Sequence, residues 1–276
     1  MKKTPENKNI LIYYKSLRSS LLFKEILFEN PKLFDCVIQM PALPYSRKTS
    51  KRNFKKLFKT FFESPEFVVM QFFTIYFYSF LSFFSNKSIK NICHRKKIKH
   101  HYFEKIDDYL LSFLKAQDPN IVINSTSSLL PKEMIKIPKE GIINFHEGPL
   151  PSYRGSASYF WFFINREIEA NATCHFVEEE LDAGEIIFEG PKITIGECLS
   201  VFDLWIKMLR SHRYSWNYIL PYLYSGEKLP STKQSLLNQN IYSYPDKNAM
   251  KIFRKNKYKV FIFNDIFCFF KVSLSF

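Results

Sequence analysis

The chain contains little that favours a disulfide framework or a zinc site. Its 276 residues include five cysteines, an odd number without paired spacing, at positions 36, 93, 174, 198 and 268. Three histidines lie near the second of them, in a spacing that fits no zinc motif. Scattered, unpaired cysteines are typical of a reducing compartment. We therefore predict no disulfide framework and no bound metal.

The N-terminus lacks the apolar core of a signal peptide. Residues 1–8 are polar and rich in lysine, and an apolar run follows directly at residues 10–14. A signal peptide would carry its apolar stretch behind a short basic start and end at a small-residue cleavage site. We therefore expect a cytoplasmic protein.

Apolar runs alternate with amphipathic segments along most of the chain. Continuous apolar strands of four to seven residues are typical of parallel sheets that are buried on both faces. We therefore predict an α/β fold with a mainly parallel sheet, whose ligands bind at the carboxyl ends of the strands. The pattern predicts strands at residues 10–14, 33–39 and 121–124, and helices at 19–29, 106–117 and 200–223, the last broken at Pro221.

We expect two parts in the chain. Residues 1–196 form the main α/β domain, which an insert at residues 46–101 interrupts. Residues 197–276 form a C-terminal extension of helices and a small β addition, with a strand at 258–263. A chain of 276 residues is long enough for one large domain with such an appendage.

The insert carries most of the positive charge. Thirteen Lys and Arg residues lie between positions 46 and 101 against two Glu, which accounts for eleven of the fourteen net positive charges. Between two basic clusters, residues 67–84 are uncharged and rich in aromatic residues. This length raises the question of a membrane span. However, the flanking strands belong to one sheet, and polar residues at 71, 74, 78, 82 and 85 recur with helical spacing.

Three interpretations of this insert are open. In the first, which we favour, its helix packs against the sheet or a partner subunit of a homo-oligomer, and the lysines are solvated. In the second, it makes a peripheral contact with the anionic lipids at the inner face of the cell membrane. In the third, it binds nucleic acid, although the basic runs contain no recognisable nucleic-acid module.

The most informative motifs lie in residues 141–155 and 175–187. Asn144 and His146 are two residues apart on a run that starts apolar, so on a strand both side chains leave the same face. Asp182 precedes Ala-Gly, which indicates a turn at a strand end. Each residue alone is explained by a turn cap or a core histidine. Together, an amide donor, a titratable base and a carboxylate are typical of an acyl-transfer site.

These motifs resemble those of the formyltransferases that use 10-formyltetrahydrofolate. The resemblance rests on Asn-x-His at 144–146, Leu-Pro-x-Tyr-Arg-Gly at 150–155 and Leu-Asp-x-Gly at 181–184, in this order. The family includes glycinamide ribonucleotide, methionyl-tRNA and sugar N-formyltransferases. The resemblance implies a Rossmann-like formyltransferase core, 10-formyltetrahydrofolate as co-substrate, a primary amine as acceptor and no metal.

The resemblance also implies roles for individual residues. Asn144 and protonated His146 would stabilise the anionic oxygen of the tetrahedral intermediate. Asp182 would take part in proton transfer and favour the protonated form of His146. His175 matches the pattern as well, either as support for the site or as plain core packing. The pteridine ring of the folate would bind to two loops, through Ser125, Thr126, Ser127, Leu129, Glu178, Glu179, Glu180 and Leu181.

The sequence favours an amino sugar, nucleotide-linked or lipid-linked, as the acceptor. Glycinamide ribonucleotide is disfavoured because the loop at residues 15–20 has no glycine to build a phosphate cradle. Methionyl-tRNA is an alternative because the chain is basic. A catalytically idle relative that serves as a membrane-associated interaction protein is another. Glu147 stands where the family pattern often has Pro or Asn, and its effect is not predicted.

Overall fold

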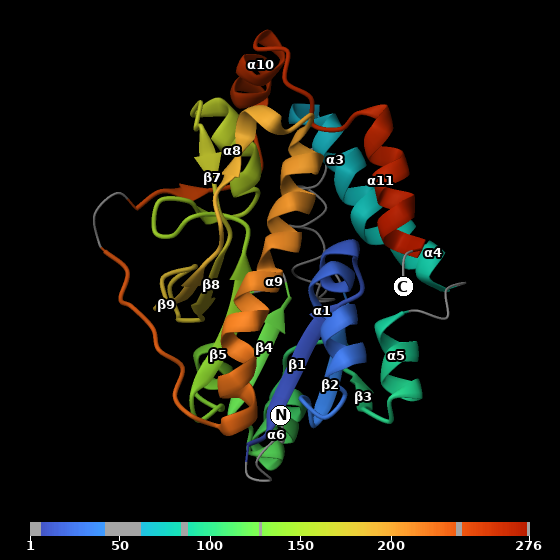
Figure 1. Cartoon of the computed structure of the whole chain (residues 1–276), viewed down its shortest axis with the longest axis vertical. Coiled ribbons are helices and arrows are strands. Elements are labelled where there is room, and N and C mark those ends of the chain that lie inside the picture. Colours follow the sequence, from blue (N-terminus) through green and yellow to red (C-terminus); the bar gives the residue numbers. More distant parts are fainter. Residues whose placement is uncertain (1–6, 42–61, 84–87, 127–128, 236–238, 275–276) are drawn as a thin grey trace.

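The computed structural model describes residues 7–41, 62–83, 88–126, 129–235 and 239–274. Its centre is a seven-stranded sheet in the order β3-β2-β1-β4-β5-β8-β9 (Figure 1). The first five of these strands are parallel, and β8 and β9 are antiparallel to their neighbours. The predicted mainly parallel α/β sheet is confirmed. The strands are β1 (Asn9–Tyr14), β2 (Cys36–Met40), β3 (Lys99–Tyr102), β4 (Ile121–Ser125), β5 (Gly141–His146), β8 (Thr173–Phe176) and β9 (Ile186–Glu189).

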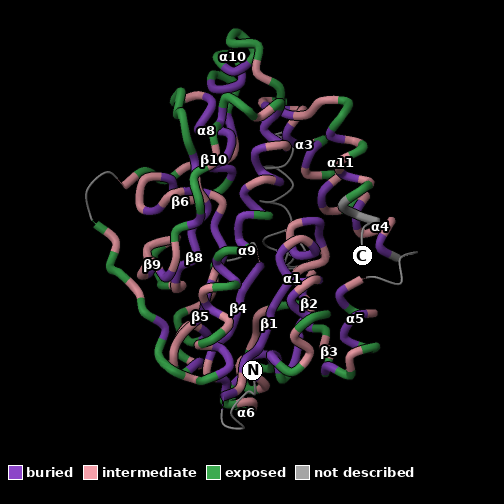
Figure 2. Tube along the Cα trace, in the orientation of Figure 1, coloured by how far each residue is buried: buried purple, intermediate pink, exposed green. Residues whose placement is uncertain are grey.

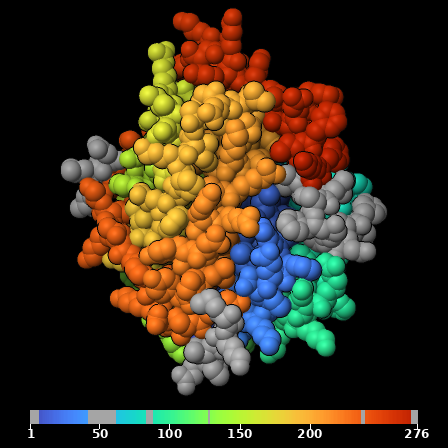
Figure 3. Space-filling view, viewed as in Figure 1, coloured from blue at the N-terminus to red at the C-terminus, as the bar shows by residue number. Residues whose placement is uncertain are grey.

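Helices cover both faces of the sheet. α1 (Leu17–Glu29) and α9 (Val201–Ser225) pack on the face that Leu11 and Tyr13 reach, and Figure 3 shows α9 lying across this face beside α1. α6 (Asp108–Gln117) packs on the other face, against Ile10 and Ile12. The central strands are therefore buried (Figure 2), which explains their continuous apolar sequence.

Side chains cap the starts of these helices. Ser16 Oγ accepts a hydrogen bond from the Ser19 N–H at the start of α1, and Ser200 Oγ accepts one from the Asp203 N–H at the start of α9. Asp107 does the same at the start of α6. Each cap satisfies an amide that the helix leaves unpaired. The cap of α1 also places the β1–α1 loop at the carboxyl edge of the sheet.

The predicted break of α9 at Pro221 is wrong. The helix continues to Ser225 and ends at Gly226, which has a φ of 77°. Pro221 itself is exposed, whereas Leu223 is fully buried. The side-chain amides of Asn7 and Asn9 both donate to the Leu223 carbonyl oxygen, at 2.7 and 2.8 Å. Packing and these bonds offset the one helical hydrogen bond that proline removes.

The predicted strand at 258–263 is also wrong. Backbone carbonyls of Lys259 and Val260 accept hydrogen bonds from the first amides of α9, Val201 and Phe202. The segment is therefore held by a helix end instead of a strand, and α11 starts at Phe263. The rest of the C-terminal part holds α10 (Lys247–Lys255), α11 (Phe263–Leu274) and a two-residue strand, β11 (Ile241–Tyr242).

Two small pairings and three short helices complete the described elements. β11 pairs in parallel with β6 (Arg154–Gly155), and β7 (Glu169–Ala170) pairs antiparallel with β10 (Ile193–Thr194). The β6–β11 pair joins the Tyr-Arg-Gly segment to the C-terminal part of the chain. The short helices are α7 (Lys132–Ile135), α8 (Ser158–Ile164) and the 3₁₀-helix η2 (Ile195–Glu197).

The insert contains one continuous helical run. Residues 46–61 and 84–87 of the predicted insert lie outside the described residues. The run consists of α3 (Pro65–Gln71), the π-helix η1 (Phe72–Phe77) and α4 (Tyr78–Phe83). It is followed by α5 (Ile89–Arg95), which packs on α1, and by β3, which pairs with β2. The last residues of the predicted insert therefore belong to the sheet.

The described helix packs on the protein, as the first interpretation of the insert predicts. Phe67 and Met70 of α3 are fully buried, and the rings of Phe73 and Phe77 contact Phe269 of α11 at centroid distances of 6.0 and 5.9 Å. Within the described part of the chain, the helices are too short or too polar to cross a membrane.

Trp216 of α9 joins this helix to the sheet. Its Nε1–H donates to the Leu22 carbonyl oxygen of α1 at 2.9 Å, and its ring contacts Phe34 of the core and Phe145 of β5. We expect Trp216→Ala to lower the free energy of unfolding by about 3–5 kcal/mol, because it removes a large buried ring and leaves a cavity. Tyr214→Ala, at an exposed position of the same helix, should change it little. Urea unfolding measures both, and equal losses would contradict this role.

His212 of α9 gives the fold a pH dependence. It is 1% exposed, and burial, aided by the charge of Arg18, lowers its pKa well below the ordinary 6.5. The unfolded chain therefore binds the proton more readily, so the stability that neutral His212 contributes is present above about pH 6.5 and is lost as the pH falls. Between about pH 7 and about pH 5, His212→Phe should lose less unfolding free energy than the wild type. Exposed His94→Phe is the control; identical pH dependence in all three proteins would contradict the prediction.

Candidate active site

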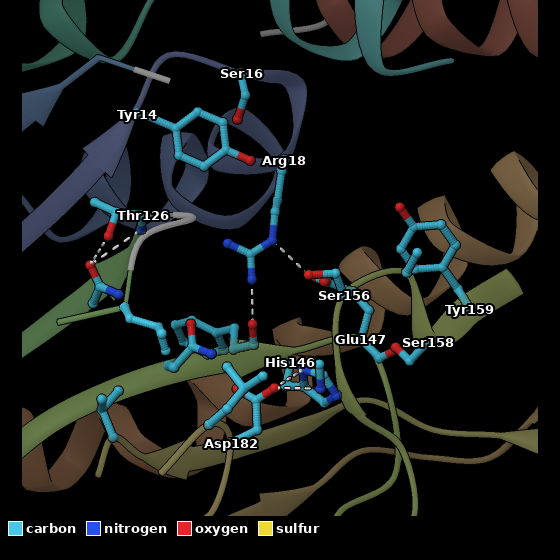
Figure 4. Close-up of a pocket in the computed structure, with 18 of the residues that line it drawn as sticks. Tyr14, Ser16, Arg18, Thr126, His146, Glu147, Ser156, Ser158, Tyr159 and Asp182 are labelled. Atoms are coloured by element: carbon cyan, nitrogen blue, oxygen red, sulfur yellow. Dashed lines mark hydrogen bonds and ion pairs between the residues drawn. The ribbon is translucent and has the colours of Figure 1, made fainter. Parts of the chain in front are cut away.

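A cavity of about 440 Å³ lies at the carboxyl ends of β1, β4 and β5 (Figure 4). Asn144 and His146 line it from β5, and Asp182 lines it from the loop between β8 and β9. The two β5 side chains therefore share a face, and the structure brings all three predicted catalytic residues to one cavity. The antiparallel pairing of β5 with β8 explains this, because it sets Asn144 opposite His175.

His146 lies between two oxygens. Its Nε2 is 2.6 Å from the Tyr153 carbonyl oxygen, and because a carbonyl only accepts, this nitrogen carries a proton. Its Nδ1 is 3.6 Å from Asp182 Oδ2. The side chain is 6% exposed, so little water competes for these contacts. Nδ1 is therefore the nitrogen that can gain or lose a proton beside the carboxylate.

Two segments hold Asp182. The Gly155 N–H of β6 donates to its Oδ2 at 2.8 Å, and Gln234 Nε2 donates to its backbone carbonyl at 2.8 Å and to that of Gly184 at 2.7 Å. The backbone of Asp182 has a φ of 50°, a left-handed conformation that Asp adopts more readily than most residues. The carboxylate is thus fixed by residues that lie before and after it in the chain.

Two glycines of the motifs are required by close backbone approach. A Cβ at Gly184 would lie 2.0 Å from the Phe176 carbonyl oxygen, and one at Gly155 would lie 2.2 Å from the Tyr242 carbonyl oxygen. Any other residue would force these segments apart. The Asp-x-Gly and Arg-Gly parts of the motifs therefore set the position of the loop that carries Asp182.

His175 orients Asn144. Its Nδ1 donates to the Phe176 carbonyl oxygen at 2.6 Å, and its Nε2 accepts from Asn144 Nδ2 at 3.3 Å. Burial lowers the pKa of His175 to about 4, although Asp182 opposes the shift. His175 is therefore neutral, and its 3.7 Å approach to Asp182 is not an ion pair at neutral pH. Of its two predicted roles, the geometry favours support for the site.

Arg18 enters the cavity from the first turn of α1. Its Nε donates to Glu147 at 2.8 Å (Figure 4), its Nη1 donates to Ser125 Oγ at 2.5 Å, and its Nη2 donates to the Phe145 carbonyl oxygen. Burial lowers the pKa of Arg18, but Glu147, Tyr14 and Tyr159 together more than offset this and raise it above its ordinary value. Glu147, whose role the sequence left open, is thus the counter-ion of a buried guanidinium.

The predicted folate-binding residues divide into two groups. Thr126, Leu129, Glu178 and Leu181 line the cavity. Ser125, Glu179 and Glu180 do not: the first binds Arg18, and the two carboxylates pair with Lys132 and Arg154. Ser127 lies outside the described residues.

Several cavity residues were not predicted from the sequence. Arg18 comes four residues after the end of β1, and the carboxyl ends of parallel strands meet at one edge of the sheet. Its position in the chain could therefore have predicted that it lies near the cavity. Gln71 and Thr74 belong to the polar stripe of the insert, whose destination the sequence did not show. Aromatic residues line the cavity too, from four separate segments: Tyr14, Tyr159, Trp205 and Tyr244.

We also searched the described residues for metal ligands. Within the ranges that the structure describes, no three His, Cys, Asp or Glu side chains form a group able to hold a metal ion.

The segment that contains this site is similar to known proteins. Residues 84–199 match the model of the formyl transferase family. Over 104 residues the chain is 35% identical to methionyl-tRNA formyltransferase of Clostridioides difficile, which covers 37% of this chain and 33% of that protein. Over 93 residues it is 33% identical to GDP-perosamine N-formyltransferase of Brucella melitensis, which covers 33% of this chain and 36% of that protein. The matches thus span about a third of the length of these relatives.

The fold is similar to that of a solved N-formyltransferase from Helicobacter canadensis, in complex with folinic acid and dTDP-3-aminofucose. The TM-score is 0.55 at 16% identity, over 95% of this chain and 85% of that one. At this identity the likeness shows the fold alone, and the family model and relatives add the evidence from sequence. Residues 84–199, which include Asn144, His146 and Asp182, are similar in sequence to the formyl transferase family.

Proposed function

We propose that the protein transfers a formyl group from 10-formyltetrahydrofolate to a primary amine in the cytoplasm. The observation that carries this proposal is the arrangement of Asn144, His146 and Asp182 around one cavity. The match of residues 84–199 to the formyl transferase family model supports it.

Asn144 supplies a donor for the oxygen that becomes anionic when the amine attacks the formyl carbon. Its Nδ2 carries two protons, and one of them is donated to His175. Because His175 is fixed by the Phe176 carbonyl, the amide is held in one orientation with its other proton free for the substrate. A donor that is already oriented needs no reorganisation during the reaction.

His146 and Asp182 move protons. The attacking ammonium must lose a proton before its nitrogen can bond, and the folate nitrogen must gain one when its bond to the formyl carbon breaks. Nδ1 of His146, 3.6 Å from Asp182 Oδ2, is placed to exchange a proton with the carboxylate. When protonated, Nδ1 is also a second donor for the oxyanion.

The cavity fits a folate co-substrate. Its volume lies in the range of small-molecule sites, about 300–1,000 Å³. Apolar side chains of Leu129, Leu130, Val177 and Leu181 line the cavity, which suits the faces of a pteridine ring. When bound, the co-substrate supplies the activated formyl group. These side chains would hold it in the cavity that Asn144 also lines.

An amino sugar is the acceptor that the site favours. Proteins bind small polar ligands between aromatic rings and a few well-placed polar groups. The named substrate of the Brucella relative and the dTDP-3-aminofucose of the Helicobacter structure support this choice. The cavity offers both kinds of group, with Tyr14, Tyr159, Trp205 and Tyr244 as rings and Gln71, Thr74 and Ser156 as polar side chains.

Methionyl-tRNA is the second candidate acceptor. The Clostridioides relative, which is 35% identical over the matched residues, favours it. The chain is also basic, as a tRNA-binding protein must be, with a net charge of +14.

The test is release of tetrahydrofolate by the purified full chain, with 10-formyltetrahydrofolate and a panel of amines. The panel contains nucleotide-linked amino sugars, methionyl-tRNA and glycinamide ribonucleotide, and mass spectrometry identifies the products. Release that depends on an amino sugar, with a formylated product, supports the proposal. Release with methionyl-tRNA alone makes methionyl-tRNA the acceptor in place of an amino sugar. Absence of folate binding overturns the proposal of formyl transfer and favours a catalytically idle interaction protein.

We expect Asn144→Ala and His146→Ala each to lower kcat by at least about a hundred-fold, because each removes a donor to the oxyanion. Thermal unfolding should change little, which separates a chemical from a structural effect. His94→Ala, at an exposed position of α5, is the matched control. Near-wild-type kcat in either cavity variant would remove that residue from the mechanism.

Arg18 is a positioning residue, because it anchors the backbone between Asn144 and His146. We expect Arg18→Lys to keep the charge but lose the three-way contact, and to lower kcat by about ten- to a hundred-fold. KM for the folate should change less than kcat. Arg213→Lys, in an exposed pair with Glu25, controls for the substitution itself. An unchanged kcat in Arg18→Lys would show that this anchor is dispensable.

A further inference from the structure

The helical run α3–η1–α4 has its polar side turned inward. Thr74, Tyr78 and Ser82 are 3%, 3% and 4% exposed, and Ser79 Oγ donates to the Lys15 carbonyl oxygen. Thr74, Tyr78 and Ser82 belong to the polar stripe of the sequence. A helix on a water-facing surface normally turns such a stripe outward. The opposite arrangement needs an explanation.

The outer side of the same run is apolar. Val69, Phe72, Tyr76 and Phe80 are 46%, 53%, 50% and 60% exposed, and they recur every three or four residues, which places them on one side of the helix. The rings of Phe72 and Tyr76 lie 6.0 Å apart. Single exposed apolar residues need no explanation, but a row of them marks a binding surface.

α11 extends this surface. It packs against the run through Phe269, and its Phe263 and Phe267 are 71% and 63% exposed with ring centroids 5.4 Å apart. Figure 1 shows α3, α4 and α11 together at one edge of the molecule, with α5 next to α4. We call the exposed residues of this edge the aromatic face: Val69, Phe72, Tyr76, Phe80, Phe263 and Phe267.

The surroundings of the aromatic face are positively charged. Lys271 of α11, Lys90 and Arg95 of α5, and Lys97 just after α5 are exposed. The acidic groups of these helices are neutralised or buried: Glu66 pairs with Arg254 at 2.7 Å, and Asp265 is 4% exposed.

We propose that the aromatic face binds the surface of a membrane that contains anionic lipids. Exposed aromatic rings enter the interface between headgroups and acyl chains, while lysine and arginine stay over the anionic headgroups. A helix that lies in the plane of the membrane needs an apolar outer side and no spanning length. The positive charge favours an anionic membrane over a second copy of this chain as the partner of the aromatic face, because two such basic regions repel each other.

The proposal goes beyond formyl transfer and does not depend on it. It does concern the same element, because Gln71 and Thr74 on the inner side of the run line the catalytic cavity. The membrane would therefore lie one helix away from the site.

The test is flotation of the full chain with vesicles of phosphatidylcholine, with and without phosphatidylglycerol. We expect flotation with the anionic vesicles and its release by salt. The double variant F72S/F80S should bind them at least about ten-fold more weakly. The matched control is Y109S/I168S, whose residues are 74% and 78% exposed in other parts of the fold, and it should bind like the wild type. Circular dichroism and urea unfolding check that each variant is folded.

A second variant, F263S/F267S, tests the face from α11 and keeps the test valid if F72S/F80S does not fold. Absence of flotation with anionic vesicles at low salt overturns the proposal, as does equal flotation of the wild type and both variants. Light scattering tests the other possible occupant, a second copy of this chain. If the wild type is a dimer, F72S/F80S is a monomer and neither binds vesicles, the aromatic face is a dimer interface and the membrane proposal is overturned. Formyl transfer is measured separately, so either proposal can fail alone.

Discussion

The Arg18 guanidinium connects the parts of the site that the sheet alone leaves separate. From the first turn of α1 it reaches Ser125 at the end of β4 and the Phe145 carbonyl at the end of β5. Parallel strands bring these ends to one edge, but only side-chain bonds fix them relative to one another. A buried guanidinium is stable there because Glu147 balances its charge. The orientation of the catalytic backbone thus depends on an ion pair outside the family motifs.

Much of the fold and the centre of the site could be predicted from local sequence. Continuous apolar runs identified β1, β2 and β4, and the two-residue spacing of Asn144 and His146 placed both at one strand face. Asp182 could be assigned by its turn. Its contact with His146 depends on the pairing of β5 with β8 and on the hydrogen bond from Gly155.

The two wrong predictions, a break in α9 and a strand at residues 258–263, have a common cause. Contacts between distant parts of the chain override the local conformational preference of each segment. Pro221 normally ends a helix, yet α9 continues because Asn7 and Asn9, over two hundred residues earlier, bind its last turn. Residues 258–263 have the apolar pattern of a strand, but their carbonyls cap a helix instead. Neither partner is visible from the segment itself. Glu147 and Arg18 are a pair for the same reason, because the chain separates them by 129 residues.

The loop that carries Asp182 is closed by residues that follow it in the chain. Gln234 binds the carbonyls of Asp182 and Gly184, and β11 pairs with β6, whose Gly155 donates to the carboxylate. During synthesis from the N-terminus, a chain that has just left the ribosome up to β9 already contains every family motif and the Gly155 donor, but it lacks Gln234 and β11. The loop of such a nascent chain is therefore not yet held by the partners that follow it. The order of synthesis therefore delays assembly of the site until the last quarter of the chain has folded onto it.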